Sequence, residues 1–446
     1  MSRQKPDKTV KKGMKMAEDV KVPEGWDVSN LGKLASFING YAFKPEDWKE
    51  EGLPIIRIEQ LKDPNAKYDY SDKKLPDIYL IDNGDLIFSW SATLAIKLWD
   101  RGKAYLNQHL YKVLPNSTIK KRFLKCLLEH KIEDLSKETH GSTMKHITRT
   151  FLLNFRVTYP KSKLEQRKIA EILETIDNAI EKTDAIIEKY KRIKQGLMQD
   201  LLTRGIAESD ELGVMSYELR DEKKHRFWDS PLGRIPEEWE VAELEAISFN
   251  ITDGKHGDCQ DEENSGYYFV SAKDIYDGKI HYENVRQITK RDFEEAHKRT
   301  KLEPFDIILT NSGTIGKIAI IKDQPETYKT TFQKSVAIIK LNTDLANPYF
   351  IAQKLESIIK KLINESYGSA QQNLLLRDLR RLLILLPPLP EQHHIASILS
   401  QIDEAIEKEQ KYKEKLERIK RGLMEDLLTG KVRVLGVMNY ELGVKS

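Results

Sequence analysis

The segment RIKQGLMQDLLT at Arg192–Thr203 returns almost unchanged at Arg418–Thr429, where the chain reads RIKRGLMEDLLT, 226 positions later (418 minus 192). The match extends over Glu165–Thr203 and Glu391–Thr429, with roughly 24 of 39 positions identical. Repetition over this length exceeds what a shared helical composition produces. It predicts that the chain is built from two copies of one structural unit.

The repeat continues, with gaps, outside this segment. Further matching pairs are VPEGWDVSNLGKL from Val22 with IPEEWEVAELEAI from Ile235, GDLIFSWSATLAI from Gly84 with FDIILTNSGTIGK from Phe305, Asn107-Gln108-His109 with the nearby Phe332-Gln333-Lys334, and GVMSYEL from Gly213 with GVMNYEL from Gly436. Each unit is therefore predicted to hold a variable region of about 140 to 150 residues, a long near-identical segment and a linker.

Apolar residues in the near-identical segment recur at steps of three and four, which predicts a long amphipathic helix. Pro390 and Glu391 mark the start of the second copy, and Gly205 and Gly430 follow the two copies as C-terminal caps. A helix of about 38 residues is roughly 57 Å long and needs a partner to cover its apolar stripe. We expect the other copy to be that partner, although dimerisation coils are an alternative. The residues expected to pair are Ile169, Ile176, Ile180, Ile193, Leu197, Ile395, Ile402, Ile406, Ile419 and Leu423.

Composition limits the class of protein. The 446 residues, 32% of them charged, are enough for two or three domains with separate cores, and the repeat favours two. No apolar run is long enough to span a bilayer, so a cytoplasmic location without membrane contact is expected. Cys126 and Cys259 have no neighbouring ligand pattern, so neither a metal site nor a disulfide framework is expected.

The two variable regions, residues 22–160 and 235–386, contain both strand-like and helix-like runs and are predicted to be α+β domains. We call them the first and second variable domains. Acidic residues dominate the first half of each domain and basic residues the second half. This distribution predicts one positive face per domain, with plain solvated charge as the alternative.

Short polar loops differ between the copies at corresponding places. They surround Gly40, Gly254 and the strand ends near Ser89 and Thr310, and they carry the hydrogen-bonding groups that read base edges and contact phosphates. Two related sites that read different targets explain such differences better than ordinary turns do. The candidate DNA contacts are Tyr41, Lys44, Ser89, Trp90, Ser91, Thr93, Gln108, His109, Thr143, Lys145, His146, Lys255, His256, Lys273, Thr310, Asn311, Ser312, Thr314, Lys317, Gln333, Lys334, Gln371 and Gln372.

The chain resembles the specificity subunit of type I restriction-modification systems. The resemblance rests on LPPLPEQHHIASILSQIDEAIEK from Leu386, on RIKRGLMEDLLTGKV from Arg418, on the first copies of both, and on SPLGRIPEEWEV from Ser230 and YGSAQQNLLLRDLRRLLILLPP from Tyr367. It covers nearly the whole chain from Val22 to Met438. The first copy departs from the pattern, with Pro160-Lys161-Ser162-Lys163-Leu164 where the second has Pro387-Pro388-Leu389-Pro390.

The resemblance implies two target-recognition domains separated by two long helices that pack as an antiparallel coiled coil. The expected order is a basic tail (1–21), the first variable domain (22–160), a long helix (161–205), a linker (206–234), the second variable domain (235–386), the second helix (387–430) and a C-terminal segment (431–446). Each domain would read one half of an asymmetric, bipartite sequence in double-stranded DNA, and the helices would fix the spacer.

The resemblance also implies partners and the location of the chemistry. Two modification subunits that bind S-adenosylmethionine and methylate adenine would dock on this chain. Restriction subunits that use ATP and Mg would join them. No catalytic residue, metal ligand or cofactor is expected in the chain itself.

Other functions were weighed on specific motifs. Asn347-Pro348-Tyr349-Phe350 superficially resembles an adenine methyltransferase motif but suits a helix cap. Gly313-Thr314-Ile315-Gly316-Lys317 lacks the spacing of a phosphate-binding loop. A coiled-coil scaffold with two domains that bind other ligands is a further alternative.

Overall fold

The computed structural model describes residues 22–63, 65–91, 93–137, 147–211, 214–365 and 373–434. The chain divides into two compact units. The first unit is Met1–Asp184 with Tyr412–Ser446, and the second is Ala185–Lys411. Each unit holds one variable domain and a part of both long helices, α6 (Lys163–Leu201) and α10 (Leu389–Leu428).

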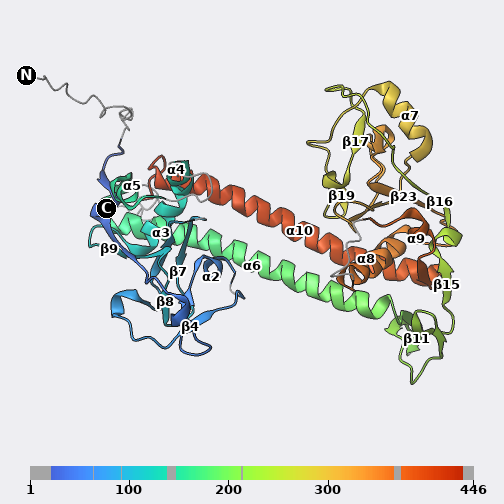
Figure 1. Ribbon diagram of the computed structural model, residues 1–446, viewed down its shortest axis with the longest axis horizontal. Helices are drawn as coiled ribbons and strands as arrows, with labels where there is room; N and C mark the ends of the chain where they lie inside the picture. The colour runs from blue at the N-terminus through green and yellow to red at the C-terminus, as the bar shows by residue number, and fades with distance from the viewer. Residues whose placement is uncertain are drawn as a thin grey trace, which may run out of the picture. The chain divides into compact units, whose positions relative to one another are not determined.

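The first unit contains two four-stranded sheets (Figure 1). One sheet has the order β2 (Ala35–Asn39), β9 (Leu110–Pro115), β6 (Leu86–Ser89) and β7 (Ala95–Leu98). The other has the order β4 (Asp69–Ser71), β3 (Leu53–Ile56), β8 (Ala104–Leu106) and β5 (Leu80–Ile81). A separate pair joins β1 (Trp26–Asn30) to β10 (Arg156–Pro160). The helices are α1 (Leu31–Leu34), α2 (Ile58–Lys62), α3 (Lys121–His130), α4 (Ile132–Lys137) and α5 (Arg149–Asn154).

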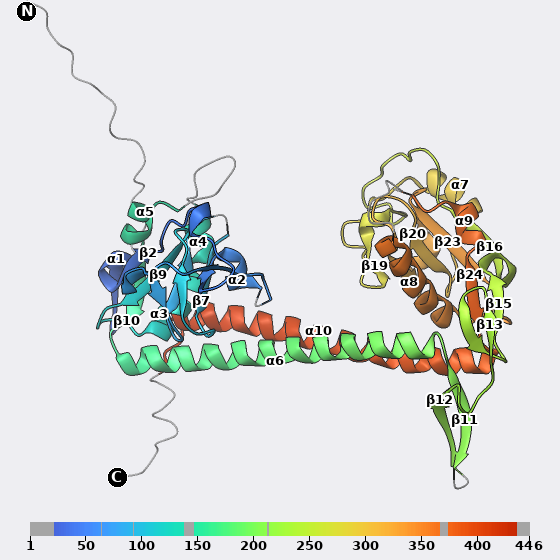
Figure 2. The same cartoon turned by 60° about the horizontal axis from the view of Figure 1, so that its bottom comes forward.

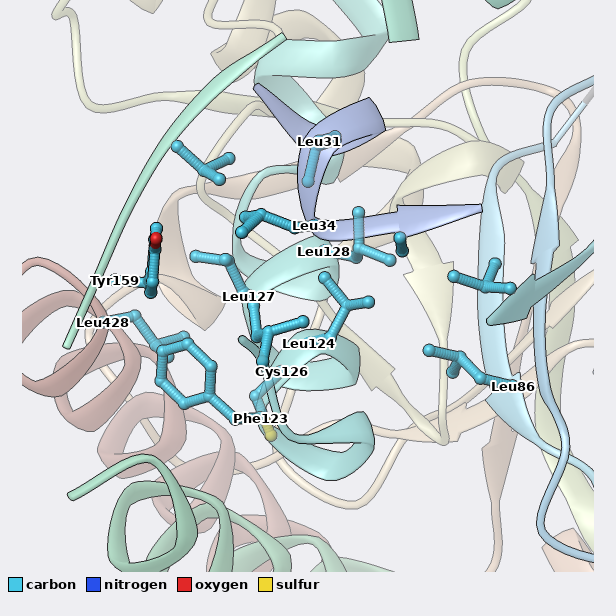
Figure 3. Close-up of a cluster of buried hydrophobic side chains, with 14 of the residues drawn as sticks. Leu31, Leu34, Leu86, Phe123, Leu124, Cys126, Leu127, Leu128, Tyr159 and Leu428 are labelled. Atoms are coloured by element: carbon cyan, nitrogen blue, oxygen red, sulfur yellow. The ribbon is translucent and has the colours of Figure 1, made fainter. Parts of the chain in front are cut away.

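The core of the first unit forms around α3. Its buried face carries Phe123, Leu124, Leu127 and Leu128, which lie among Leu31, Leu34, Leu86, Tyr159 and Leu428 (Figure 3). Leu428 belongs to α10, so the last residues of the second long helix complete the core of the first variable domain. Burial in this core raises the pKa of the Cys126 thiol to about 12, which keeps the thiol protonated and unreactive at neutral pH.

The second unit repeats the first sheet. Its order is β16 (Ser248–Asp253), β23 (Val336–Leu341), β20 (Ile307–Thr310) and β21 (Ile318–Ile320). Further strand pairs of the variable domain are β17 (Tyr268–Val270) with β22 (Thr330–Phe332), β15 (Glu240–Glu243) with β24 (Leu383–Leu386), and β18 (Ile275–Tyr276) with β19 (Lys279–Ile280). The helices are α7 (Lys290–Thr300), α8 (Pro348–Glu365) and α9 (Leu376–Arg380).

The segment 206–234, interpreted from the sequence as a linker, forms regular structure. Strands β11 (Ile206–Glu211) and β12 (Val214–Leu219) make one hairpin directly after α6 (Figure 2). Strands β13 (Phe227–Ser230) and β14 (Gly233–Pro236) make another.

The two long helices pair in antiparallel fashion within each unit, and the sequence repeat explains how. In the first unit Lys420 Nζ lies 2.5 Å from Asp177 Oδ1. In the second unit Lys194 Nζ lies 2.8 Å from Asp403 Oδ1. The aspartates and the lysines are each 226 positions apart (403 minus 177 and 420 minus 194), so the repeated sequence supplies the same ion pair twice. The predicted α+β architecture with a paired, duplicated helix is confirmed.

Burial along the expected helix stripe is uneven. Ile169 and Ile395 are fully buried, but each packs into the core of a variable domain. Ile176, Ile180, Leu197, Ile402, Ile406 and Leu423 are half-buried. Ile193 and Ile419 are 39% and 40% exposed. A helix that has a single neighbour leaves part of its apolar stripe exposed, whereas a domain core covers its residues from all sides.

The Glu-Gln pair that opens each repeated segment anchors the helix start. The side-chain oxygen of Gln166 accepts from the Lys120 amide (2.8 Å), and that of Gln392 accepts from the Asn347 amide (2.9 Å). Both glutamines are fully buried, and each also donates to two backbone oxygens. The Glu-Gln motif therefore fixes each long helix to the variable domain that precedes it.

The glutamate of each pair binds an arginine that follows the other long helix. Glu165, which is fully buried, pairs with Arg433 (2.7 Å). Glu391 pairs with Arg220 and also accepts from Trp239 Nε1 (3.1 Å). Thus the end of one helix is tied to the beginning of the other, once in each unit.

Candidate nucleic-acid interface

Four backbone hydrogen bonds bring separate segments of the first variable domain together. The Tyr41 amide donates to Leu106 O (2.7 Å), and Tyr41 O accepts from the Gln108 amide (2.9 Å). The Trp90 amide donates to His109 O (3.4 Å), and Trp90 O accepts from the Ile147 amide (3.1 Å). We call the group formed by Tyr41, the loop 89–93, the turn 107–109 and Ile147 the first cluster.

The second variable domain contains the same four bonds. The Lys255 amide donates to Phe332 O (2.7 Å), and Lys255 O accepts from the Lys334 amide (3.2 Å). The Asn311 amide donates to Ser335 O (3.0 Å), and Asn311 O accepts from the Leu374 amide (2.8 Å). We call the group formed by Lys255, the loop 310–316, the turn 333–335 and Leu374 the second cluster.

These bonds define equivalent positions independently of side-chain identity. Tyr41 corresponds to Lys255, Trp90 to Asn311 and Gln108 to Lys334. The isolated bridges Tyr41–Asn107 and Lys255–Gln333 then make Asn107 the equivalent of Gln333. The sequence comparison, which placed Asn107 near Phe332, is corrected by one residue.

A glycine precedes the first segment of each cluster because no side chain fits there. A Cβ on Gly40 would lie 2.2 Å from Leu106 O, and a Cβ on Gly254 would lie 2.1 Å from Phe332 O. Such contacts are far inside van der Waals distance, so the close backbone approach requires glycine. The glycine turns at Gly40 and Gly254 therefore match in sequence because both have the same close backbone contact.

The first cluster is aromatic. The ring of Trp90 lies 5.8 Å from that of His109, and Trp90 Nε1 donates to Gln108 O (3.3 Å). Tyr41 packs against Phe43 and accepts at its hydroxyl from Lys73 Nζ (2.8 Å). Hydrogen bonds from Lys73 Nζ to Tyr41 and Asp47 raise the pKa of that lysine, which keeps it positively charged.

The second cluster is polar and cationic. Lys255 Nζ lies 3.4 Å from Glu295, and Lys334 is exposed. Beside them, His256 Nε2 lies 2.9 Å from Asp253 Oδ2, and Arg299 pairs with the other oxygen of Asp253. The same backbone frame thus carries different chemistry in the two domains.

The candidate residues differ in exposure. Lys44, Thr93, Gln108, His256, Lys273, Thr314 and Lys334 are exposed, and Tyr41, Trp90, His109, Lys255, Ser312, Lys317 and Gln333 are half-buried. Ser89, Ser91, Thr310 and Asn311 are buried. Ser89 Oγ donates to Thr93 O (2.8 Å), which fits a role in shaping the loop. Thr143, Lys145, His146, Gln371 and Gln372 lie outside the described residues.

Sequence reasoning missed a cavity beside the first cluster. It has a volume of about 380 Å³ and is lined by Arg57, Ile58, Glu59, Lys62, Asn107 and His109. Arg57 pairs with Asp69 (2.7 Å) and lies over the ring of Trp48, 5.0 Å from its centre. Arg57, directly after the apolar run Leu53–Ile56, was the available signal.

The motifs that suggested other chemistry have structural roles. Asn347 caps α8, because its side-chain oxygen accepts from the amides of Tyr349 (2.9 Å) and Phe350 (3.0 Å). The segment Gly313–Lys317 connects the antiparallel strands β20 and β21. A phosphate-binding loop of the Walker type instead leads from a strand into a helix.

Metal and membrane sites were sought in the described part of the chain. It contains no group of three or more potential His, Cys, Asp or Glu ligands positioned to hold a metal ion. Among the helices of the same residues, none is long and apolar enough to cross a membrane.

The duplicated sheet, the paired long helices and the two divergent clusters define a modular protein in which one domain fold occurs twice with different side chains at the same place. The chain belongs to the family of type I restriction modification DNA specificity domains, whose model matches residues 23–191 and 236–418.

Curated relatives agree with this family. The chain is 28% identical over 427 residues to the type I restriction enzyme MjaVIII specificity subunit of Methanocaldococcus jannaschii, covering 93% of this chain and 95% of the relative. It is 27% identical over 394 residues to the EcoBI specificity subunit of Escherichia coli, covering 85% of this chain and 80% of that relative. The expectation of a type I specificity subunit, a non-catalytic component, is confirmed. The alternative of an unrelated scaffold is not supported.

Solved structures share the fold. The crystal structure of a type I restriction-modification S subunit from M. genitalium matches with a TM-score of 0.57 at 14% identity, covering 93% of this chain and 98% of that one. A structure described as showing complex assembly and conformational transition of the type I system matches with a TM-score of 0.51 at 16% identity, covering 92% and 100%.

Proposed function

We propose that each variable domain reads one half of a bipartite, asymmetric sequence in double-stranded DNA through its cluster. The observation that carries this proposal is the pair of clusters, which share four backbone hydrogen bonds and differ in the side chains they present. One frame with exchangeable side chains suits two sites that perform the same task on different sequences. A structural role alone gives no reason for the divergence.

The chemistry of the clusters fits the division between affinity and specificity. Exposed lysines, Lys334 within the second cluster and Lys44 and Lys273 outside the two clusters, would supply phosphate attraction that is independent of sequence and weakens with salt. Gln108 and Lys334 occupy equivalent exposed positions. A glutamine suits the major-groove edge of adenine and a lysine that of guanine, with about 1 to 3 kcal/mol of discrimination for a good bidentate pair.

The paired helices are proposed to fix the spacer between the half-sites and to dock two modification subunits. Those subunits would bind S-adenosylmethionine and methylate adenine. Restriction subunits that use ATP and Mg would complete the complex. This assignment rests on family membership and on the exposed charged faces of α6 and α10.

The proposal is tested by co-expressing the chain with a modification subunit from its own genome and mapping methylated adenines by single-molecule sequencing. We expect one bipartite motif with a fixed gap. Methylation at a motif without two separated halves, or the absence of any complex, would contradict the proposal. A control with S-adenosylmethionine and the chain alone should give no methylation.

A further inference from the structure

The cavity beside the first cluster borders the residues proposed to read DNA. Asn107 and His109 form one wall and belong to the first cluster. Arg57, Ile58, Glu59 and Lys62 form the other, at the beginning and on the face of α2. The cavity therefore lies next to side chains that are proposed to contact the first half-site.

The second variable domain has a position equivalent to this cavity, and backbone hydrogen bonds identify the residues that correspond to its lining. The Asn107 amide donates to Ile56 O (3.0 Å), and the equivalent Gln333 amide donates to Val270 O (2.9 Å). The following residues also match, because the Arg57 amide donates to the Gln60 side chain and the Ser271 amide donates to the Asp274 side chain, each at 2.9 Å. Ala272 is thus the equivalent of Ile58.

The hairpins β6–β7 and β20–β21 give a second equivalence between the domains. The Gly84 amide donates to Trp99 O, and the Phe305 amide donates to Ile321 O, so residues of the two hairpins can be matched from their open ends. In the first domain Ser89 faces Ala95 across the hairpin. In the second domain the Thr310 amide donates to Lys317 O (2.9 Å). Ala95 and Lys317 therefore occupy equivalent positions.

The Lys317 side chain reaches the segment of the second domain that is equivalent to Ile58, whereas the Ala95 side chain is a single methyl group. Lys317 Nζ donates to Ala272 O (3.0 Å), which is the wall equivalent to Ile58. Ala95 and Ile58 pack against the same core, formed by Ile56, Ile87, Trp99 and their neighbours. The first domain has a methyl group where the second has a lysine that reaches from the hairpin to the helix start.

We propose that the cavity at Arg57, Ile58 and His109 is a specificity pocket of the first variable domain that receives the major-groove edge of a base, and that Lys317 closes the equivalent place in the second domain. This inference rests on the proposed DNA-reading function. Around the cavity Arg57 and Lys62 can only donate and Glu59 can only accept, whereas Asn107 and His109 can do either. The pocket consequently suits an edge that presents acceptors, which is guanine or thymine, and Ile58 offers an apolar contact for the thymine methyl group.

The test is Ala95→Lys in the complete chain, co-expressed with the modification subunit, with the methylated motif mapped as above. The second domain accommodates a lysine at the equivalent position, so the variant has a structural precedent in the same chain. We expect discrimination at one or two positions of one half-site to fall by roughly 5- to 150-fold, with the other half-site and the spacer unchanged. Lys317→Ala is the reciprocal variant and should alter only the other half-site.

Unchanged discrimination in Ala95→Lys, in a complex that still reads both halves, would overturn the pocket and leave the proposed function standing. A wild-type complex without a bipartite motif would overturn both. If Ala95→Lys does not assemble, Lys62→Ala replaces it, because Lys62 is exposed and truncation leaves the core intact. A relaxed half-site in Lys62→Ala supports the pocket, and an unchanged half-site overturns it.

Discussion

Individual residues tie the two long helices together within each unit. Arg220 is 7% exposed and binds Glu391, while Arg433 makes the equivalent contact with Glu165. A buried ion pair is costly to break, because the remaining partner is left as an uncompensated charge. These arginines therefore hold the segments after the long helices in place.

Glu391→Gln tests this contact at nearly constant side-chain volume. We expect the variant to lose up to about 3 kcal/mol in free energy of unfolding, since the buried Arg220 then keeps only the more distant, exposed carboxylate of Glu238 (3.7 Å). Urea unfolding followed by tryptophan fluorescence measures the loss. The matched control is Glu425→Gln, whose solvent-exposed pair with Lys431 should contribute far less to the free energy of unfolding. Equal losses in both variants would show that the buried pair has no special role.

Lys354 gives a pH dependence. It is 6% exposed, its Nζ donates to Leu202 O (2.6 Å), and burial lowers its pKa to about 8. Because the pKa in the folded state lies below that in the unfolded state, the unfolded chain binds the proton more tightly between about pH 8 and 10.5. The free energy of unfolding contributed by this group therefore rises as the pH rises through that window.

We expect the stability of wild type relative to Lys354→Met to increase by roughly 2 kcal/mol between pH 7 and pH 9.5. Lys360→Met on the same helix is the control, because that side chain is 67% exposed and pairs only at the surface with Glu356. Urea unfolding at the two pH values measures both differences. A difference for Lys354→Met that does not change with pH would contradict the lowered pKa.

The sequence identified some of these residues and missed others for physical reasons. Asn347 could be predicted as a cap, because a cap depends on residues three positions away. Arg220 and Arg433 could not be predicted, because their partners lie 171 and 268 positions away. The cavity at Arg57 was missed for the same reason, since Asn107 and His109 come from a distant turn.

Secondary-structure elements were predicted from the sequence more completely than these side-chain contacts were. The long helices were predicted because their apolar period extends over many turns, and α6 and α10 have 39 and 40 residues. The equivalent strands β6 and β20 of the two domains were also predicted, because each is a short apolar run. The hairpins in 206–234 were not, because acidic and polar residues obscure the alternation of a strand there.

The glycine after α6 ends the helix and also makes room for the buried ion pair. Gly205 has φ +63, and a Cβ there would lie 2.1 Å from Glu391 Oε1 and 2.5 Å from Trp239. We expect Gly205→Ala to destabilise the protein clearly more than Gly278→Ala. Gly278 has a similar φ of +69, but a Cβ there meets no atom of the described chain within 4 Å. Urea unfolding compares the variants, and equal losses would show that only backbone conformation matters.

In the complete chain, the paired long helices are proposed to set the distance between the two DNA half-sites. Residues 177 and 184 face 420 and 413 in the first unit, and 194 faces 403 in the second, so one antiparallel register applies to both. Seven residues inserted after Glu181, with seven more after Lys415, should keep this register and the apolar stripe. Such an insertion lengthens each helix by about 10 Å.

We expect the doubly inserted chain to methylate the same two half-sites with a spacer longer by about three base pairs. Mapping of methylated adenines in the co-expressed complex measures the spacer. Insertion in α6 alone is the control and should impair assembly, because the ion pairs lose their register. An unchanged spacer in the double insertion would show that the helices do not set the distance.

Each cluster is proposed to read one half-site independently of the other. Lys334→Gln tests this independence, because Lys334 is exposed and occupies the position that Gln108 holds in the first cluster. The measurement is the methylated motif of this variant in complex with the modification subunit. We predict a changed base preference in one half-site, with the other half and the spacer identical to wild type. A change in both halves, or an unchanged motif, would contradict the account.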